Sequence, residues 1–100
     1  MRKREVSLQS TVVAGKHQVS ADLSGEAALL HLKTGIYYSL DPMGGQIWNL
    51  IQKPRKAGEL RRFILERYDV DPERCENDLL ELLRRLAAED LIQVSNAPAA

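Results

Sequence analysis

One stretch of the chain decides the fold, residues 27–42, which reads AALLHLKTGIYYSLDP. Two runs of β-favouring residues, 27–32 and 36–40, flank a short loop in which Gly35 can adopt the positive φ that a tight hairpin turn requires. Asp41 and Pro42 then end the strand pattern, because aspartate is a good helix N-cap and proline suits the first helical position. The stretch therefore predicts an antiparallel hairpin that leads directly into a helix.

The residues before this stretch extend the predicted sheet. Residues 17–22 alternate weakly between polar and apolar and end at a turn signal, residues 23–26, so they predict a further antiparallel strand. Residues 1–10 are polar and charged and are expected to form a flexible N-terminal segment. Residues 95–100 are expected to be a flexible tail, which leaves residues 11–94 as a single domain.

Three helices are predicted after the sheet. The first begins at Pro42 and ends before Pro54, the second covers about 57–68, and the third covers about 72–90. Residues 91–94 suit a short closing strand. The predicted fold class is thus α+β and winged-helix-like, with a three-stranded antiparallel sheet followed by three helices.

The third predicted helix has an unusually wide apolar face. At 100° per residue its apolar side chains span about 160°, whereas about 100° is enough to face one core. The residues on this face are Cys75, Leu79, Leu80, Leu82, Leu83, Leu86 and Ala87. Either the small domain wraps the helix on two sides, or part of the face serves a second contact.

The composition limits the chemistry that this chain can perform. One cysteine, Cys75, excludes an internal disulfide, and it is expected to be a small core residue because a nucleophilic role would need a nearby base. The two histidines, His17 and His31, lie far apart, and His31 is expected to be an exposed strand residue. We therefore expect no enzyme activity, no catalytic residue, no metal and no cofactor. With no signal or membrane-spanning segment, the expected location is the cytoplasm.

Charge is unevenly distributed although the net charge is zero, from 14 basic and 14 acidic residues. Residues 53–67 carry six basic and two acidic groups, and residues 68–100 carry three basic and eight acidic groups. A winged-helix DNA-binding regulator is one interpretation, but a DNA-reading helix should be basic, and the third helix is acidic. The other interpretation is peptide binding, in which an extended peptide pairs with an open sheet edge at the third strand.

Several motifs in this order resemble the PqqD-like family. They are the hairpin at 29–41, the Ile47-Trp48 pair, and the segments 68–72, 77–83 and 90–92. The match covers residues 17–94, and the Tyr-Tyr hairpin with the Ile-Trp pair is most similar to the stand-alone leader-binding proteins of lasso-peptide biosynthesis. His31 and Asp41 stand where the family usually has acidic and asparagine residues, and Asp90 replaces a common glycine.

The resemblance implies a RiPP precursor recognition element, a non-catalytic domain that binds the leader segment of a ribosomally made precursor peptide. It further implies that the leader lies as an extra strand against the third strand and packs on the third helix. The residues implied on the strand are Ile36, Tyr37, Tyr38, Ser39 and Leu40, and those on the helix are Asp78, Leu79, Leu82, Arg85 and Leu86.

The partners implied are the precursor peptide, a separate transglutaminase-like leader peptidase and an ATP-dependent cyclase, with no nucleic acid and no membrane. Another class of modified peptide, such as one matured by a radical SAM enzyme, is the alternative to a lasso peptide.

Overall fold

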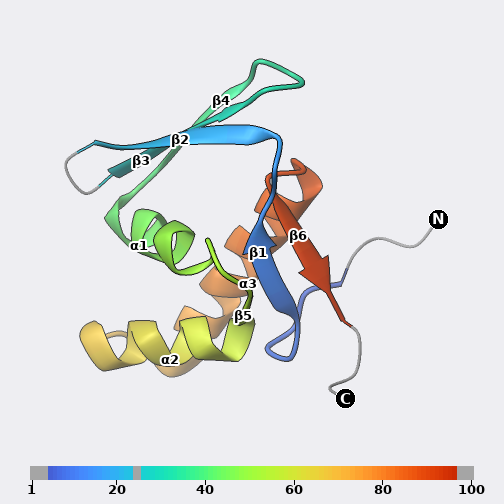
Figure 1. Ribbon diagram of the computed structural model, residues 1–100. Helices are drawn as coiled ribbons and strands as arrows, with labels where there is room; N and C mark the ends of the chain where they lie inside the picture. Colours follow the sequence, from blue (N-terminus) through green and yellow to red (C-terminus); the bar gives the residue numbers. More distant parts are fainter. Residues whose placement is uncertain (1–4, 24–25, 97–100) are drawn as a thin grey trace.

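The computed structural model describes residues 5–23 and 26–96, which form two three-stranded antiparallel sheets and three helices. Figure 1 shows how these elements are arranged. The elements are β1 (Thr11–Ala14), β2 (Gln18–Leu23), β3 (Glu26–His31), β4 (Tyr37–Leu40), α1 (Pro42–Leu50), β5 (Arg55–Lys56), α2 (Ala57–Arg67), α3 (Pro72–Ala88) and β6 (Ile92–Ser95). The predicted α+β class, with a three-stranded antiparallel sheet followed by three helices, is confirmed.

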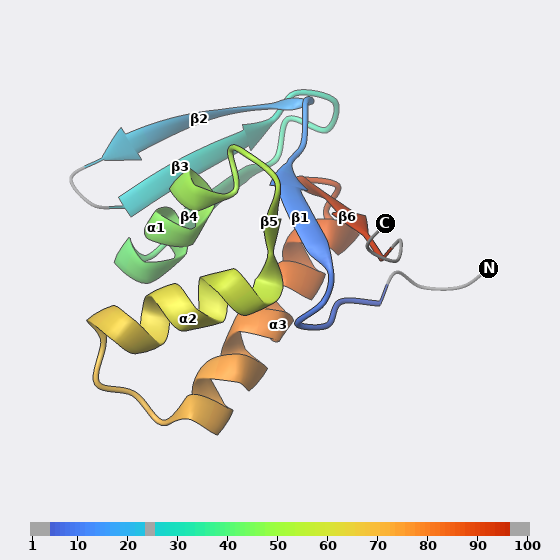
Figure 2. The same cartoon turned by 60° about the horizontal axis from the view of Figure 1, so that its bottom comes forward.

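The predicted sheet has the order β2-β3-β4, so β4 is an edge strand. Leu29 at the centre of β3 pairs with Tyr38 on β4 and is fully buried, since α1 covers one face of this sheet (Figures 1 and 2). Gly35 has a φ of 73°, which is the conformation that the hairpin loop was predicted to need. The chain leaves β4 directly into α1, and the edge of the sheet stays uncovered by any other described strand.

The second sheet, β5-β1-β6, was not predicted as a sheet. Its central strand, β1, pairs with β6 from the far end of the chain, with Thr11 opposite Ser95. The predicted closing strand at residues 91–94 corresponds to β6, whereas β5 has only two residues and carries no alternation that could be recognised.

The described part of the N-terminal segment packs against the domain. Val6 and Ser10 are buried, and the side-chain amide of Asn96 donates to the carbonyl of Glu5 at 2.8 Å. The Ser10 hydroxyl also donates to the Asn96 side chain. The packed structure therefore begins before residue 11 and includes residue 96, while residues 1–4 and 97–100 of the expected flexible segments lie outside the described residues.

Two aspartate-proline pairs start α1 and α3, as predicted. Asp41 accepts a hydrogen bond from the amide of Gly44 at 2.8 Å, and Asp71 accepts one from the amide of Arg74 at 2.9 Å. In each case proline follows in the first helical turn, where its missing donor costs nothing. Helix α1 ends at Leu50, before Pro54 as predicted, and α3 ends at Ala88, slightly before the predicted end at about residue 90.

Asp90 ends α3 in a left-handed conformation, with a φ of 59°. Its amide donates to the carbonyl of Ala87 at 3.0 Å, and the amide of Leu91 donates to the carbonyl of Leu86 at 2.9 Å. These two bonds form the Schellman motif that glycine usually completes, and aspartate tolerates the left-handed region better than most residues do. The end of α3 is therefore well defined.

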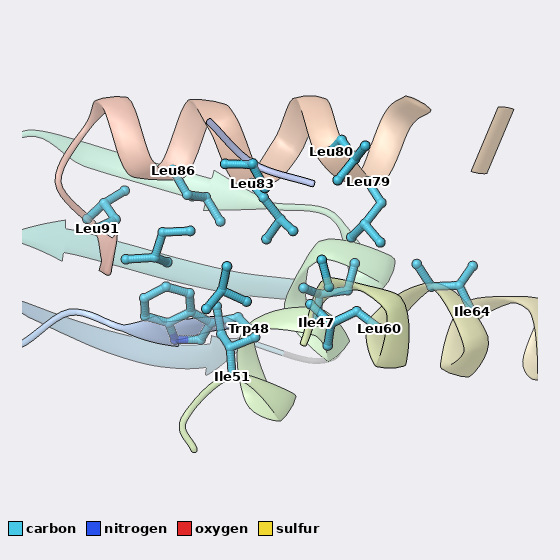
Figure 3. Packing of buried hydrophobic residues seen from close by; sticks show 14 of the residues in the cluster. Ile47, Trp48, Ile51, Leu60, Ile64, Leu79, Leu80, Leu83, Leu86 and Leu91 are labelled. Carbon is cyan, nitrogen blue, oxygen red and sulfur yellow. The ribbon is translucent and has the colours of Figure 1, made fainter. Parts of the chain in front are cut away.

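The core lies between α3, the other two helices and the strands, which contribute Val12, Leu29 and Ile92. Figure 3 shows the leucines of α3 pointing toward side chains of α1 and α2. Leu79, Leu80, Leu83 and Leu86 are buried on α3, whereas Leu82 is only partly buried. The wide apolar face of α3 thus exceeds what the core covers.

His31 was expected to be exposed, and this prediction was wrong. The residue is 2% exposed, because its side chain lies on the inner side of the hairpin near the end of α3. Its Nε2 is 3.7 Å from an Asp90 carboxylate oxygen, and its Nδ1 accepts a hydrogen bond from the amide of Lys33 at 3.2 Å.

Within the described ranges, no helix combines the length and the apolar character that crossing a membrane requires.

Candidate functional site

A groove of about 580 Å³ separates β4 and the start of α1 from α3. Most of its lining is apolar. The lining residues are Ser39, Leu40, Asp41, Met43, Gly44, Ile47, Ile64, Val70, Asp71, Arg74, Cys75, Asp78, Leu79, Leu82 and Arg85. A volume of this size lies in the usual range for ligand sites and can take several side chains of a peptide.

The strand that borders this groove presents free backbone groups. The amide of His31 donates to the carbonyl of Ile36 at 3.0 Å, so the Ile36 carbonyl points toward β3. Antiparallel pairing alternates, so Tyr38 and Leu40 also direct their backbone groups toward β3. The amides and carbonyls of Tyr37 and Ser39 therefore point to the open edge.

Charged groups of both signs surround the apolar floor. The carboxylates of Asp41 and Asp71 are engaged as helix caps. On α3, the Nε of Arg74 lies 3.9 Å from a carboxylate oxygen of Asp78, and both side chains are largely exposed. An exposed pair of this kind is held weakly, so either partner can turn to a ligand.

The structure brings six of the ten expected binding residues together around the groove. Ser39 and Leu40 line it from β4, and Asp78, Leu79, Leu82 and Arg85 line it from α3.

The other four expected residues lie elsewhere. Ile36 and Tyr37 are exposed at the start of the strand, with 50% and 66% of their surface accessible. The Tyr38 hydroxyl donates to a carboxylate oxygen of Glu89 at 3.3 Å. Leu86 does not line the groove, because its side chain is buried in the core.

Sequence reasoning missed the groove residues that come from α1 and α2. Met43, Gly44 and Ile47 lie opposite the first half of α3, and Ile64 of α2 contributes to the floor. No local pattern marks them as different from other core residues. On α3, by contrast, Cys75 shares the helical spacing of Leu79 and Leu82, so the amphipathic pattern could have placed it in the groove.

The ionisable groups of the groove are poorly suited to covalent catalysis. Cys75 is 7% exposed, and burial is the main cause that raises the pKa of its thiol, although nearby Arg61 acts in the opposite direction. A raised pKa disfavours the thiolate that a nucleophile needs. Across residues 5–23 and 26–96, no group of three histidine, cysteine or acidic side chains is placed to hold a metal ion.

Comparison with known proteins adds two findings. The family model described as "Coenzyme PQQ synthesis protein D (PqqD)" matches residues 26–92. The solved structure "TbiB1 in Complex with the TbiA(beta) Leader Peptide" is 34% identical, with a TM-score of 0.75 over 87% of this chain and 99% of that chain. No curated protein matches this chain. The groove and the open strand edge thus occur on a backbone shared with a protein that was solved with a peptide bound.

Proposed function

This chain belongs to the PqqD family, and we propose that it binds the leader segment of a ribosomally synthesised precursor peptide as an added strand beside β4. One observation carries the proposal: the apolar groove adjoins the free backbone edge of a sheet. An extended peptide satisfies both features at once, because its backbone pairs with the edge and every second side chain enters the groove.

The register of β4 defines how the leader pairs. Tyr37 and Ser39 offer two amides and two carbonyls, so they can hold a short segment of the leader through up to four hydrogen bonds. Leader residues opposite Tyr38 and Leu40 lie on the same face as those side chains, which pack against the core. That face is the one that borders α3.

The proposed role in biosynthesis is delivery and not catalysis. The protein recognises the leader, in our proposal that of a lasso-peptide precursor, and presents the precursor in the cytoplasm to a separate transglutaminase-like leader peptidase and to a cyclase. The raised pKa of the Cys75 thiol supports a non-catalytic role. Purified protein should neither cleave nor modify a precursor peptide, and turnover that disappears in Cys75→Ala would contradict this role.

Leader binding can be measured with two fluorescein-labelled peptides. One is the TbiA(beta) leader of the solved complex, and the other is the leader of a short precursor peptide to be identified among the genes that neighbour this one. We expect fluorescence anisotropy to give a Kd near 1 µM or tighter for at least one of them, about −8 kcal/mol or better. A scrambled peptide of the same composition is the control. Failure of both leaders to bind would overturn the proposed function.

Amide hydrogen exchange tests the binding mode. The amides of Tyr38 and Leu40 are already paired with β3, so the leader should add protection mainly at Tyr37 and Ser39. New protection confined to the basic helix α2, around Lys56, Arg61 and Arg62, would contradict strand addition even if a leader binds.

A further inference from the structure

The groove ends where the hairpin meets the C-terminal end of α3. Arg85 and Ser39 are the last lining residues at this end. One helical turn beyond Arg85 lies Glu89, and one residue before Ser39 lies Tyr38. These two side chains meet, because the Tyr38 hydroxyl donates to a Glu89 carboxylate oxygen at 3.3 Å.

The helix end that carries Glu89 is itself fixed. Glu89 follows the last residue of α3, and its amide donates to the carbonyl of Arg85 at 3.1 Å. The next residue, Asp90, completes the Schellman motif and lies 3.7 Å from Nε2 of the buried His31 on β3. Two neighbouring residues of the helix end therefore contact two strands of the same hairpin.

We propose that Tyr38 and Glu89 are positioning residues that hold β4 and α3 at the separation at which the groove accepts a leader. This inference rests on the proposed function. A bound leader must lie one strand spacing from β4, about 4.8 Å, while its side chains contact α3. Both contacts form together only if the strand and the helix are held at a fixed separation, and a site held in advance binds more tightly than one that must be ordered on binding.

The ionisation of Tyr38 reports on this contact. Partial burial of the Tyr38 side chain is the first cause that raises the pKa of its hydroxyl, which lies at the surface, and the carboxylate of Glu89 raises this pKa further, while Arg85 acts in the opposite direction. Removal of the Glu89 charge should therefore lower the pKa of Tyr38, which an ultraviolet titration of tyrosinate detects without any peptide.

The test combines four variants, Tyr38→Phe, Glu89→Ala, Glu89→Gln and the double variant Tyr38→Phe/Glu89→Ala, with the two labelled leaders described above. Tyr38→Phe and Glu89→Ala should each weaken leader binding by about threefold or more. The double variant should bind no more weakly than either single variant, because both substitutions remove the same contact. Glu89→Gln should bind nearly as wild type does, since its amide oxygen can accept the same hydrogen bond.

Tyr68→Phe is the matched control. This substitution also removes a tyrosine hydroxyl, which accepts a hydrogen bond from Gln46 Nε2 at 2.9 Å. This contact, however, joins α1 to the end of α2. Thermal unfolding of every variant shows whether it is folded at the assay temperature, and Tyr68→Phe should leave the leader Kd unchanged.

The outcomes separate the two proposals. If the wild-type protein binds neither leader, the proposed function fails. If it binds one of them, two results would overturn the positioning role while leader binding stands. One is that Tyr38→Phe or Glu89→Ala binds the leader as tightly as wild type does. The other is that the losses of binding free energy in the two single variants add in the double variant. An unchanged Tyr38 titration in Glu89→Gln would likewise overturn the contact on which the inference depends.

Discussion

We expect truncation of Leu82 to alanine to separate leader binding from folding in this protein. Leu82 lines the groove and is only partly buried, whereas its neighbour Leu83 is 0% exposed and packs in the core. Both substitutions remove the same atoms from adjacent positions of α3. The pair therefore compares a groove contact with a core contact at equal chemical change.

Leu82→Ala should mainly weaken leader binding, whereas Leu83→Ala should mainly lower the free energy of unfolding. Loss of a well-packed contact to the leader should cost about 1–2 kcal/mol of binding free energy, which corresponds to a Kd about 5- to 30-fold weaker for Leu82→Ala. Its free energy of unfolding should fall by about 1 kcal/mol or less, because the side chain already borders solvent. Leu83→Ala should lower the free energy of unfolding by about 2–5 kcal/mol through the cavity that it leaves.

Two measurements decide this prediction. Fluorescence anisotropy with the labelled leader gives the Kd of each variant, and urea unfolding followed by circular dichroism gives the free energy of unfolding. A domain of this size is typically stable by about 5–15 kcal/mol, so the urea titration also shows whether Leu83→Ala is folded under the conditions of the binding assay. The reasoning is refuted if Leu82→Ala binds as wild type does, or if it destabilises the domain as much as Leu83→Ala does.

Three further predictions concern salt, thiol reactivity and a helix cap. Leader affinity should change little between about 50 and 200 mM salt. A protein with 6–10 phosphate contacts loses about 10³-fold or more of its DNA affinity over this range. Steeply salt-dependent binding to duplex DNA in anisotropy titrations would therefore favour the DNA-binding alternative. Burial raises the pKa of the Cys75 thiol, so at pH 8 this thiol is less ionised than that of an ordinary cysteine. Mass spectrometry should therefore find that iodoacetamide alkylates Cys75 more slowly in the folded protein than in the urea-unfolded chain. The alkylation rate should rise with pH in the alkaline range and fall when the leader is bound. Alkylation of the folded protein at pH 7 as fast as that of the unfolded chain would contradict the raised pKa of Cys75. Asp41→Ala should lower the free energy of unfolding in urea by about 0.5–2 kcal/mol, because the Gly44 amide loses its acceptor, and Asp41→Asn should retain most of the stability.

Local signals in the sequence were sufficient for the hairpin and for the helix starts. Gly35, Asp41-Pro42 and Asp71-Pro72 each act within a few residues of themselves, so their effect could be predicted without knowledge of the rest of the fold. The wide apolar face of α3 left two alternatives open, a core on two sides of the helix or a second contact, and the groove lies along its partly buried edge at Leu82.

Features that depend on distant residues could not be predicted in this way. The pairing of β1 with β6 joins the two ends of the chain, and the burial of His31 depends on the end of α3. The contribution of Met43, Ile47 and Ile64 to the groove follows from how α1 and α2 pack, and an apolar helical residue looks the same in sequence whether it borders a core or a cavity.

The shortness of the free edge has a kinetic consequence. With only Tyr37 and Ser39 available for pairing, a bound leader is held by few backbone bonds and by the side chains in one groove. For a Kd near 1 µM and an association rate constant of about 10⁵–10⁷ M⁻¹ s⁻¹, the dissociation rate constant is about 0.1–10 s⁻¹. In the proposed binding mode the peptide would then stay for a time between a fraction of a second and about ten seconds, which would let many precursors pass through one molecule.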